Sequence, residues 1–119
     1  DIKSFFNDRI EVCVNAGISE DKIVLDPGFG FGKTLNQNLE MLKRLSEFKS
    51  FNLPVLVGIS RKSMIGTLLD NRNVDGRVSG SVTAAIMAIR NGANVVRVHD
   101  VLETKDALTI WQSVNQFKG

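Results

Sequence analysis

Cysteine is almost absent from this chain of 119 residues, in which Cys13 is the only one. A single cysteine excludes an internal disulfide bond. The apolar spacing around Cys13 predicts a helix with the thiol on its apolar side, and there we expect a buried small side chain rather than a reactive one. This composition fits a reducing compartment, so we expect a cytoplasmic protein.

An excess of charge of one sign is also missing. The 15 Lys and Arg residues nearly balance the 13 Asp and Glu residues, which leaves a net charge of +2. Because there is no basic run and no series of stacking aromatics, we expect no nucleic-acid partner. The longest apolar runs have the length of strands, so we expect no membrane span. Residues 1–4 lack a basic segment followed by an apolar one, and we expect no secretory signal there.

The chain shows no low-complexity linker, and its size and 43% hydrophobic content suit one domain over residues 1–119. Apolar spacing predicts an opening helix that ends at Gly17. Strands are then predicted over 23–26, 55–59 and 95–99, each followed by a helix. The apolar positions of these three helices are Leu39, Leu42, Leu45 and Phe48, then Val82, Ala85, Ile86 and Ile89, then Ala107, Ile110, Trp111, Val114 and Phe117.

The alternation of strand and helix indicates an α/β fold with a parallel sheet and right-handed crossovers. Both a (β/α)8 barrel and a small doubly wound sheet produce this pattern. A whole barrel takes about 250 residues, and here a helix precedes the first strand. We therefore interpret the chain as the C-terminal part of a TIM (β/α)8 barrel, with three parallel strand–helix units that correspond to strands six, seven and eight.

Polar and charged side chains follow each of the three predicted strands. Asp26 ends the first, residues 60–63 (Ser-Arg-Lys-Ser) follow the second, and Arg97 and His99 lie at the end of the third. In parallel α/β proteins the chemistry lies at the carboxyl ends of the strands. The three segments are therefore predicted to form one site.

The second strand end combines a glycine with a lysine. If the extended path continues beyond the strand, Lys62 lies on the same face as Gly58 and Ser60. Gly58 has no side chain and would leave open space for a flat ligand. Lysines on a surface are usually only solvated, but a strand-end position in a barrel favours a functional one.

The charged groups at the other two ends suit different ligands. The Asp26 carboxylate accepts hydrogen bonds, which suits the adjacent N–H donors of an aminopyrimidinone edge, although a turn-forming role is the alternative. Arg97 and His99 share one face of a strand and together suit a phosphate or carboxylate. For Asp100 we predict an N-cap of the last helix rather than a contact with the imidazole.

Residues 28–32 alternate glycine and phenylalanine and imitate a nucleotide-binding loop. A P-loop would need glycine at Pro27, and the dinucleotide pattern fails as well. We therefore expect a tightly turning loop with Phe29 and Phe31 on opposite sides. One ring would fill the top of the barrel, and the other could cover an aromatic substrate.

Taken together and in this order, residues 25–33, 58–63 and 97–100 resemble dihydropteroate synthases of folate biosynthesis, of the bacterial type. The similarity covers essentially the whole chain and matches the C-terminal part of the family. It implies a transferase in which the amine of p-aminobenzoate displaces diphosphate from 6-hydroxymethyl-7,8-dihydropterin diphosphate to give 7,8-dihydropteroate. It also implies that sulfonamides target the enzyme.

The resemblance implies a set of substrate-binding residues. Asp26 would bind the pyrimidine edge of the pterin, and Lys62, next to Gly58, would contact the pterin and the aminobenzoate region. Ser63 would meet the aminobenzoate carboxylate, and Phe31 would flank its ring.

Arg97 and His99 would bind the departing diphosphate, so that these two residues and Lys62 are the catalytic candidates. The resemblance further implies Mg²⁺ on the diphosphate and a homo-oligomer. No carboxylate cluster in this sequence suits the metal, so its ligand is expected elsewhere in a full-length enzyme. Because the amino-terminal strands and loops of the family are not in this chain, we expect the chain alone to be inactive.

Two alternatives remain, the first from the same superfold and the second from another functional class. A pterin-binding module of a folate-dependent methyltransferase would also need an acid such as Asp26, but it has no diphosphate for Arg97 and His99 to bind. A non-catalytic half-barrel with a role in assembly would bind neither pterin nor pyrophosphate.

Overall fold

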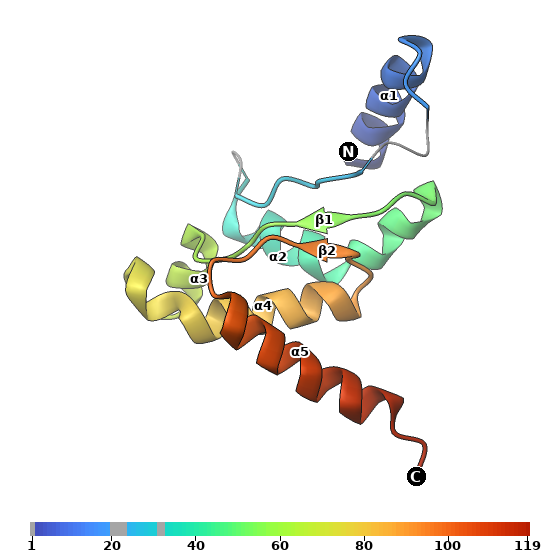
Figure 1. The fold of residues 1–119 in the computed structure, drawn as a ribbon. Helices are drawn as coiled ribbons and strands as arrows, with labels where there is room; N and C mark the ends of the chain where they lie inside the picture. Colours follow the sequence, from blue (N-terminus) through green and yellow to red (C-terminus); the bar gives the residue numbers. More distant parts are fainter. Residues whose placement is uncertain (1, 20–23, 31–32) are drawn as a thin grey trace.

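The computed structural model describes residues 2–19, 24–30 and 33–119 (Figure 1). The α-helices are α1 (Ile2–Asn15), α2 (Leu35–Lys43), α3 (Ser63–Leu68), α4 (Val78–Arg90) and α5 (Val101–Gln116). Two 3-10 helices are present, η2 (Leu45–Phe51) and η3 (Val74–Arg77), and the strands are β1 (Leu56–Val57) and β2 (Val95–Val96). Neither α3 nor η3 was predicted from the sequence.

The strands are parallel, as predicted. In β1 and β2, Leu56 pairs with Val95, and a parallel bridge joins Leu25 to Val55 on the other side. The three segments are thus neighbours in chain order. The regular strands are shorter than the predicted ranges 55–59 and 95–99, because among the described residues the backbone ladder ends with the bond from Arg97 N to Val57 O. The first predicted strand is reduced to the bridge at Leu25.

One face of the strands is buried under helices, and the other is not. Val55 and Val57 are almost fully buried, whereas Val24 and Val95, on the other face, are 53% and 48% exposed. On the covered side α4 packs against β2, and α5 packs against α4 (Figure 1). A complete parallel sheet is covered on both faces, so the exposed face is where a barrel would have its interior.

The predicted helix over residues 39–48 is in fact two elements. Thr34 and Gln37 form a capping box that starts α2, which ends at Lys43. From Leu45 the backbone is a 3-10 helix, and Leu45 and Phe48 are both buried. The apolar residues of this segment, Leu39, Leu42, Leu45 and Phe48, recur every three positions. That spacing matches the three residues per turn of a 3-10 helix better than the 3.6 residues per turn of an α-helix.

The opening helix contacts the rest of the chain through few side chains. The ring of Phe6 meets Phe48 edge-on at 5.4 Å and Phe51 at 5.9 Å between centroids. Farther along α1, Val12 and Val14 are exposed, and Cys13 is a half-buried free thiol. The prediction of a buried Cys13 is therefore only partly met.

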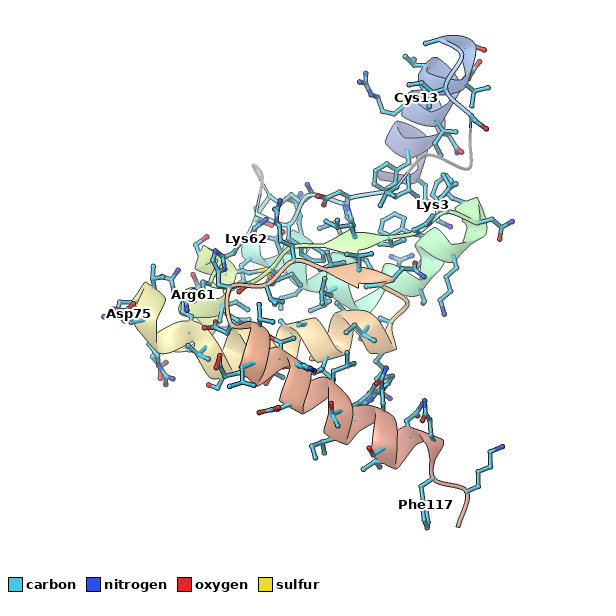
Figure 2. All side chains as sticks on the ribbon, in the orientation of Figure 1. Lys3, Cys13, Arg61, Lys62, Asp75 and Phe117 are labelled. Atoms are coloured by element: carbon cyan, nitrogen blue, oxygen red, sulfur yellow. The ribbon has the colours of Figure 1, made fainter. Side chains whose placement is uncertain are left out.

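The apolar positions predicted for the last helix are largely uncovered in this chain. Ile110, Val114 and Phe117 are 67%, 72% and 77% exposed, and Phe117 lies at the end of α5 in Figure 2. Their pattern correctly predicts a helix, but not a face buried within this chain. Among the described helices, none has the length and hydropathy needed to cross a membrane.

Candidate functional site

The strand pairing places the predicted site residues on the exposed face of the sheet. Residues in register point to the same side of a parallel sheet, and residues two apart along a strand share a face. The pairing therefore puts Asp26, Gly58 and Arg97 on the face opposite to buried Val55 and Val57. The polar residues thus share one face as predicted, although aliphatic Val24 and Val95 lie on that face as well.

Gly58 and Arg97 are direct neighbours across the two strands. A Cβ atom on Gly58 would lie 3.1 Å from Nη2 of Arg97 and 3.4 Å from its Nε. The guanidinium thus lies against the glycine backbone. The prediction that Gly58 leaves open space for a flat ligand is wrong for this structure, because the Arg97 side chain fills that space.

Lys62 reaches the site by a path that the sequence did not predict. The chain turns after Ile59, whose carbonyl accepts the Lys62 N–H at 3.0 Å, and Arg61 adopts a left-handed φ of 57°. The expected extended path past the strand is therefore wrong. The Lys62 side chain nevertheless reaches back over the loop that begins at Gly28, the glycine loop. Its Nζ donates to the Phe29 carbonyl at 2.6 Å.

Charges from the other two segments act on the Lys62 ammonium. Burial lowers the pKa of Lys62, the positive charges of Arg97 and Lys33 lower it further, and the negative charge of Asp26 opposes them. The contacts of Lys62 lie on the loop after Asp26: its Cδ would be 3.5 Å from a Cβ atom on Gly30, and its Nζ bonds the Phe29 carbonyl. Lys33, which also donates to the Gly28 carbonyl at 3.0 Å, was not among the predicted site residues.

The glycine loop turns tightly, as predicted. Gly28 and Gly30 have φ values of 75° and 87°, in the left-handed region that favours glycine. The Gly28 N–H donates to Asp26 Oδ1 at 2.9 Å, which is the turn-forming role considered for this carboxylate. A carboxylate has two acceptor oxygens, so this turn and a ligand contact are compatible. Phe29 is buried at 1% exposure, whereas Phe31 lies outside the described residues.

A buried asparagine on α2 anchors the loop. Asn38 is 3% exposed, and its Oδ1 accepts the Gly30 N–H at 3.0 Å. Asn38 was not predicted from the sequence, although a polar side chain between apolar Leu35 and Met41 on one helix face was a usable signal.

We expect Asn38→Ala to destabilise the protein by about 1–3 kcal/mol, because the Gly30 N–H loses a buried partner. Asn36→Ala, at an exposed position of the same helix, is the matched control and should change stability little. Urea unfolding of both variants measures the difference, and equal effects of the two substitutions would refute the anchoring role.

His99 is held by a serine from the second segment. Its Nδ1 lies 3.0 Å from Ser60 Oγ, and its backbone N–H donates to the same oxygen at 3.2 Å. Ser60 is buried at 8% exposure and was not predicted as a site residue. Ser63, the first residue of α3, follows Lys62 directly and is exposed.

Asp100 is the N-cap residue of α5, as predicted, but its side chain makes no capping hydrogen bond. Its two carboxylate oxygens instead accept from Nε and Nη2 of Arg61 at 3.1 and 2.5 Å. This contact lowers the pKa of Asp100 and raises that of Arg61.

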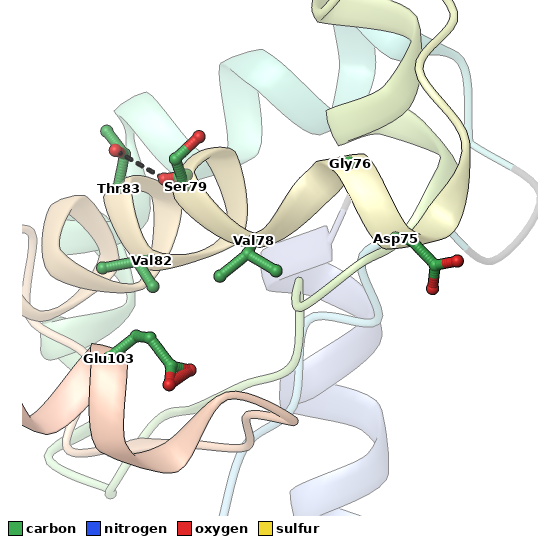
Figure 3. A pocket seen from close by; sticks show the side chains of 7 residues that line it. All are labelled: Asp75, Gly76, Val78, Ser79, Val82, Thr83 and Glu103. Atoms are coloured by element: carbon green, nitrogen blue, oxygen red, sulfur yellow. Dashed lines mark hydrogen bonds between the residues drawn. The ribbon is translucent and has the colours of Figure 1, made fainter.

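A separate groove of about 550 Å³ lies among η3, α4 and α5 (Figure 3). Asp75 and Glu103 lie on it, and the residues that line it include none of the predicted site residues. Within residues 2–19, 24–30 and 33–119, no three His, Cys, Asp or Glu side chains lie together so that they could hold a metal ion.

The family model described as "Pterin binding enzyme" matches residues 1–99. The chain belongs to this family. Dihydropteroate synthases of Escherichia coli K12 and Haemophilus influenzae are 51% and 45% identical to it over 110 and 113 residues. These alignments cover 92% and 95% of the chain but 39% and 41% of the relatives, so the chain spans about two-fifths of their length.

Solved structures of pterin binding enzymes have the same fold over almost the whole chain. The Yersinia pestis dihydropteroate synthase matches with a TM-score of 0.95 at 51% identity over 98% of this chain and 48% of its own. The Xanthomonas albilineans enzyme in complex with 7,8-dihydropteroate also gives a TM-score of 0.95, at 42% identity over 98% of this chain and 44% of its own. The predicted fold class, part of a (β/α)8 barrel, is thereby confirmed.

Proposed function

We propose that this chain is the part of a dihydropteroate synthase that binds the pterin and the leaving diphosphate. Asp26 and Arg97 share the exposed face of the strands, and Lys62 bonds the loop that follows Asp26; this arrangement carries the proposal. Complexes of the related Xanthomonas albilineans enzyme with 4-aminobenzoic acid and with 7,8-dihydropteroate support the substrates.

In the proposed reaction the amine nitrogen of p-aminobenzoate forms a bond to the pterin methylene carbon. The C–O bond to diphosphate breaks with its electron pair on the oxygen, and the new secondary amine loses a proton. Negative charge builds on the diphosphate as it leaves. Fixed positive charges at Arg97 and Lys62, with the His99 imidazole, lower that barrier because they are oriented before the reaction.

The remaining contacts orient the substrates. We assign Asp26 to the pyrimidine edge of the pterin, because a carboxylate matches two adjacent N–H donors. Ser63, exposed beside Lys62, is assigned to the aminobenzoate carboxylate, and Phe31 to its ring. We expect Mg²⁺ to be held by residues of the complete enzyme beyond this chain.

The test is product formation by the complete enzyme that contains this chain. With dihydropterin diphosphate and labelled p-aminobenzoate we expect dihydropteroate and pyrophosphate in equal amounts. Release of pyrophosphate without dihydropteroate, or no turnover, would contradict the proposal. Failure to bind inorganic pyrophosphate would favour the methyltransferase alternative, and failure to bind pterin as well would favour the assembly module.

Gly58→Ala should weaken pyrophosphate binding by the complete enzyme about tenfold. The added methyl group would push the Arg97 guanidinium away, and overpacking of this kind costs about 1–3 kcal/mol. Titration calorimetry with pyrophosphate measures the change, and p-aminobenzoate serves as the control ligand with unchanged affinity. A variant that binds pyrophosphate like the wild type would remove Arg97 from the proposed diphosphate site.

We also propose that the complete enzyme is a homo-oligomer located in the cytoplasm. The exposed apolar side chains of Ile110, Val114 and Phe117 on α5 support association, since exposed apolar patches often mark interfaces. The free thiol of Cys13 is compatible with a reducing compartment. Sedimentation velocity at micromolar concentration tests the oligomer, and a single monomeric species would exclude it.

A further inference from the structure

The segment that contains β1 and the segment that contains β2 are in contact both within the strands and in the loops after them. The contacting residues are separated by the same number of positions in both places. Within the sheet Leu56 pairs with Val95, an offset of 39 residues. Beyond the strands Ser60 still meets His99, and Arg61 meets Asp100, each at the same offset of 39. Side chains thus extend the register after the backbone ladder has ended.

We propose that the Arg61–Asp100 ion pair is a positioning device, which holds the loop that carries Lys62 in register with the loop that carries His99. The inference rests on the proposed synthase function and adds two positioning residues to it. Neither of them is assigned a contact with substrate.

The geometry of the pair suits this role. Nε and Nη2 of Arg61 donate to the two oxygens of Asp100 at 3.1 and 2.5 Å, a bidentate contact that fixes direction as well as distance. The Asp100 side chain is only 10% exposed and that of Arg61 31%. A largely buried carboxylate has little alternative solvation, so separation of the pair is costly.

The Arg61 backbone is held as tightly as its side chain. Its N–H donates to Ser81 Oγ at 2.7 Å, and its carbonyl accepts from Arg77 Nη1 at 3.0 Å. Ser81 belongs to α4 and Arg77 to η3. These two contacts hold the Arg61 backbone in its left-handed conformation. That conformation turns the chain so that Lys62 reaches the glycine loop.

Two further carboxylates stabilise the positive charge of the Arg61 guanidinium. Asp75 on η3 and Glu103 on α5, both visible in Figure 3, act together with Asp100 to raise the pKa of Arg61. Figure 2 shows Arg61 and Lys62 adjacent at the ends of the strands. Arg61 therefore links the elements around the site, while the neighbouring Lys62 faces the glycine loop.

The chain contains a matched control pair outside the site. Arg44 contacts Glu47 at 2.5 and 3.2 Å, but these side chains are 59% and 40% exposed; Arg44 follows α2, and Glu47 belongs to η2. An exposed pair of this kind contributes little to stability. Its loss should leave turnover unchanged.

The experiment compares Asp100→Asn, Arg61→Gln and the double variant in the complete enzyme, with Glu47→Gln as control. All are assayed well below their unfolding temperatures. We expect kcat to fall about 10- to 100-fold in each site variant, since small misplacements of reacting groups have effects of this size. The KM values should change less than about threefold, and the double variant should match the worse single one because the pair acts as a unit.

The reversed pair Arg61→Asp with Asp100→Arg should recover part of the lost kcat, which a merely destabilised protein would not do. Unchanged kcat in Asp100→Asn, or a loss equal to that of Glu47→Gln, would overturn the positioning role while the proposed function stands. An inactive wild type would overturn the proposed function, and this inference with it.

Discussion

No dihydropteroate synthesis is expected from the isolated 119-residue chain, even if it folds as described. The chain spans about two-fifths of the dihydropteroate synthases that it matches, so a large part of the substrate surroundings is missing. Positioning and closure over the substrate can contribute factors of 10⁵ or more to a rate, by the order of magnitude of effective molarities. A radiometric assay with labelled p-aminobenzoate should show no product above background.

The complete enzyme at the same molar concentration is the positive control. Adding the remaining part of the protein as a separate polypeptide extends the test, since reassembly of the barrel should restore turnover. Product formation by the isolated chain would contradict this prediction, because the exposed face of the strands would then suffice for catalysis.

Replacement of the central lysine should have the second-largest effect. Lys62→Met in the complete enzyme removes a cation that lies among the other charged groups of the site and is fixed by the Phe29 carbonyl. We expect kcat/KM to fall by about 10²- to 10³-fold, as for other oriented donors at developing negative charge. Lys43→Met, at an exposed position of α2, is the control and should retain full activity. A Lys62→Met enzyme with at least half of the wild-type rate would exclude the lysine from the mechanism.

The pH dependence provides a separate test of Lys62. Burial and the neighbouring cations lower its pKa, so its charge is lost at a lower pH than that of an exposed lysine. If the ammonium is the active form, kcat/KM falls as the pH rises through this lowered pKa. Lys62→Arg keeps its charge to much higher pH, and its remaining activity should lack this alkaline decline. The same decline in both enzymes would assign it to another group.

The alternation of polar and apolar residues made the strand ends predictable. Val55, Val57 and Arg97 lie on the faces that period-two alternation requires, because parallel pairing fixes which side chains share a side. The resemblance to known synthases was similarly reliable, since three motifs in one order rarely coincide by chance.

The turn after the second strand was not predictable from such patterns. Arg61 takes a left-handed conformation that is uncommon for its residue type, and contacts with Ser81 and Asp100 hold it there. Asp100 matches the sequence preference for a helix cap, but the buried Arg61 pair competes more strongly for its carboxylate. Contacts between residues 20 and 39 positions apart leave no local signature in the sequence.

The apolar spacing on α5 shows a further limit of prediction from the sequence. Ile110 and Val114 predict an amphipathic helix correctly, but periodicity does not say what covers the apolar side. Gly58 shows the same limit. Its missing side chain suggested open space for a ligand, but the Arg97 guanidinium occupies that space.

Charged groups from three separate segments are proposed to form one site for a pterin and a diphosphate. Titration calorimetry on the complete enzyme tests it with inorganic pyrophosphate and a dihydropterin as separate ligands. We predict that Arg97→Gln weakens pyrophosphate binding at least tenfold and leaves dihydropterin affinity within about twofold, whereas Asp26→Asn does the reverse. If both variants bind both ligands as the wild type does, the three segments do not form this site.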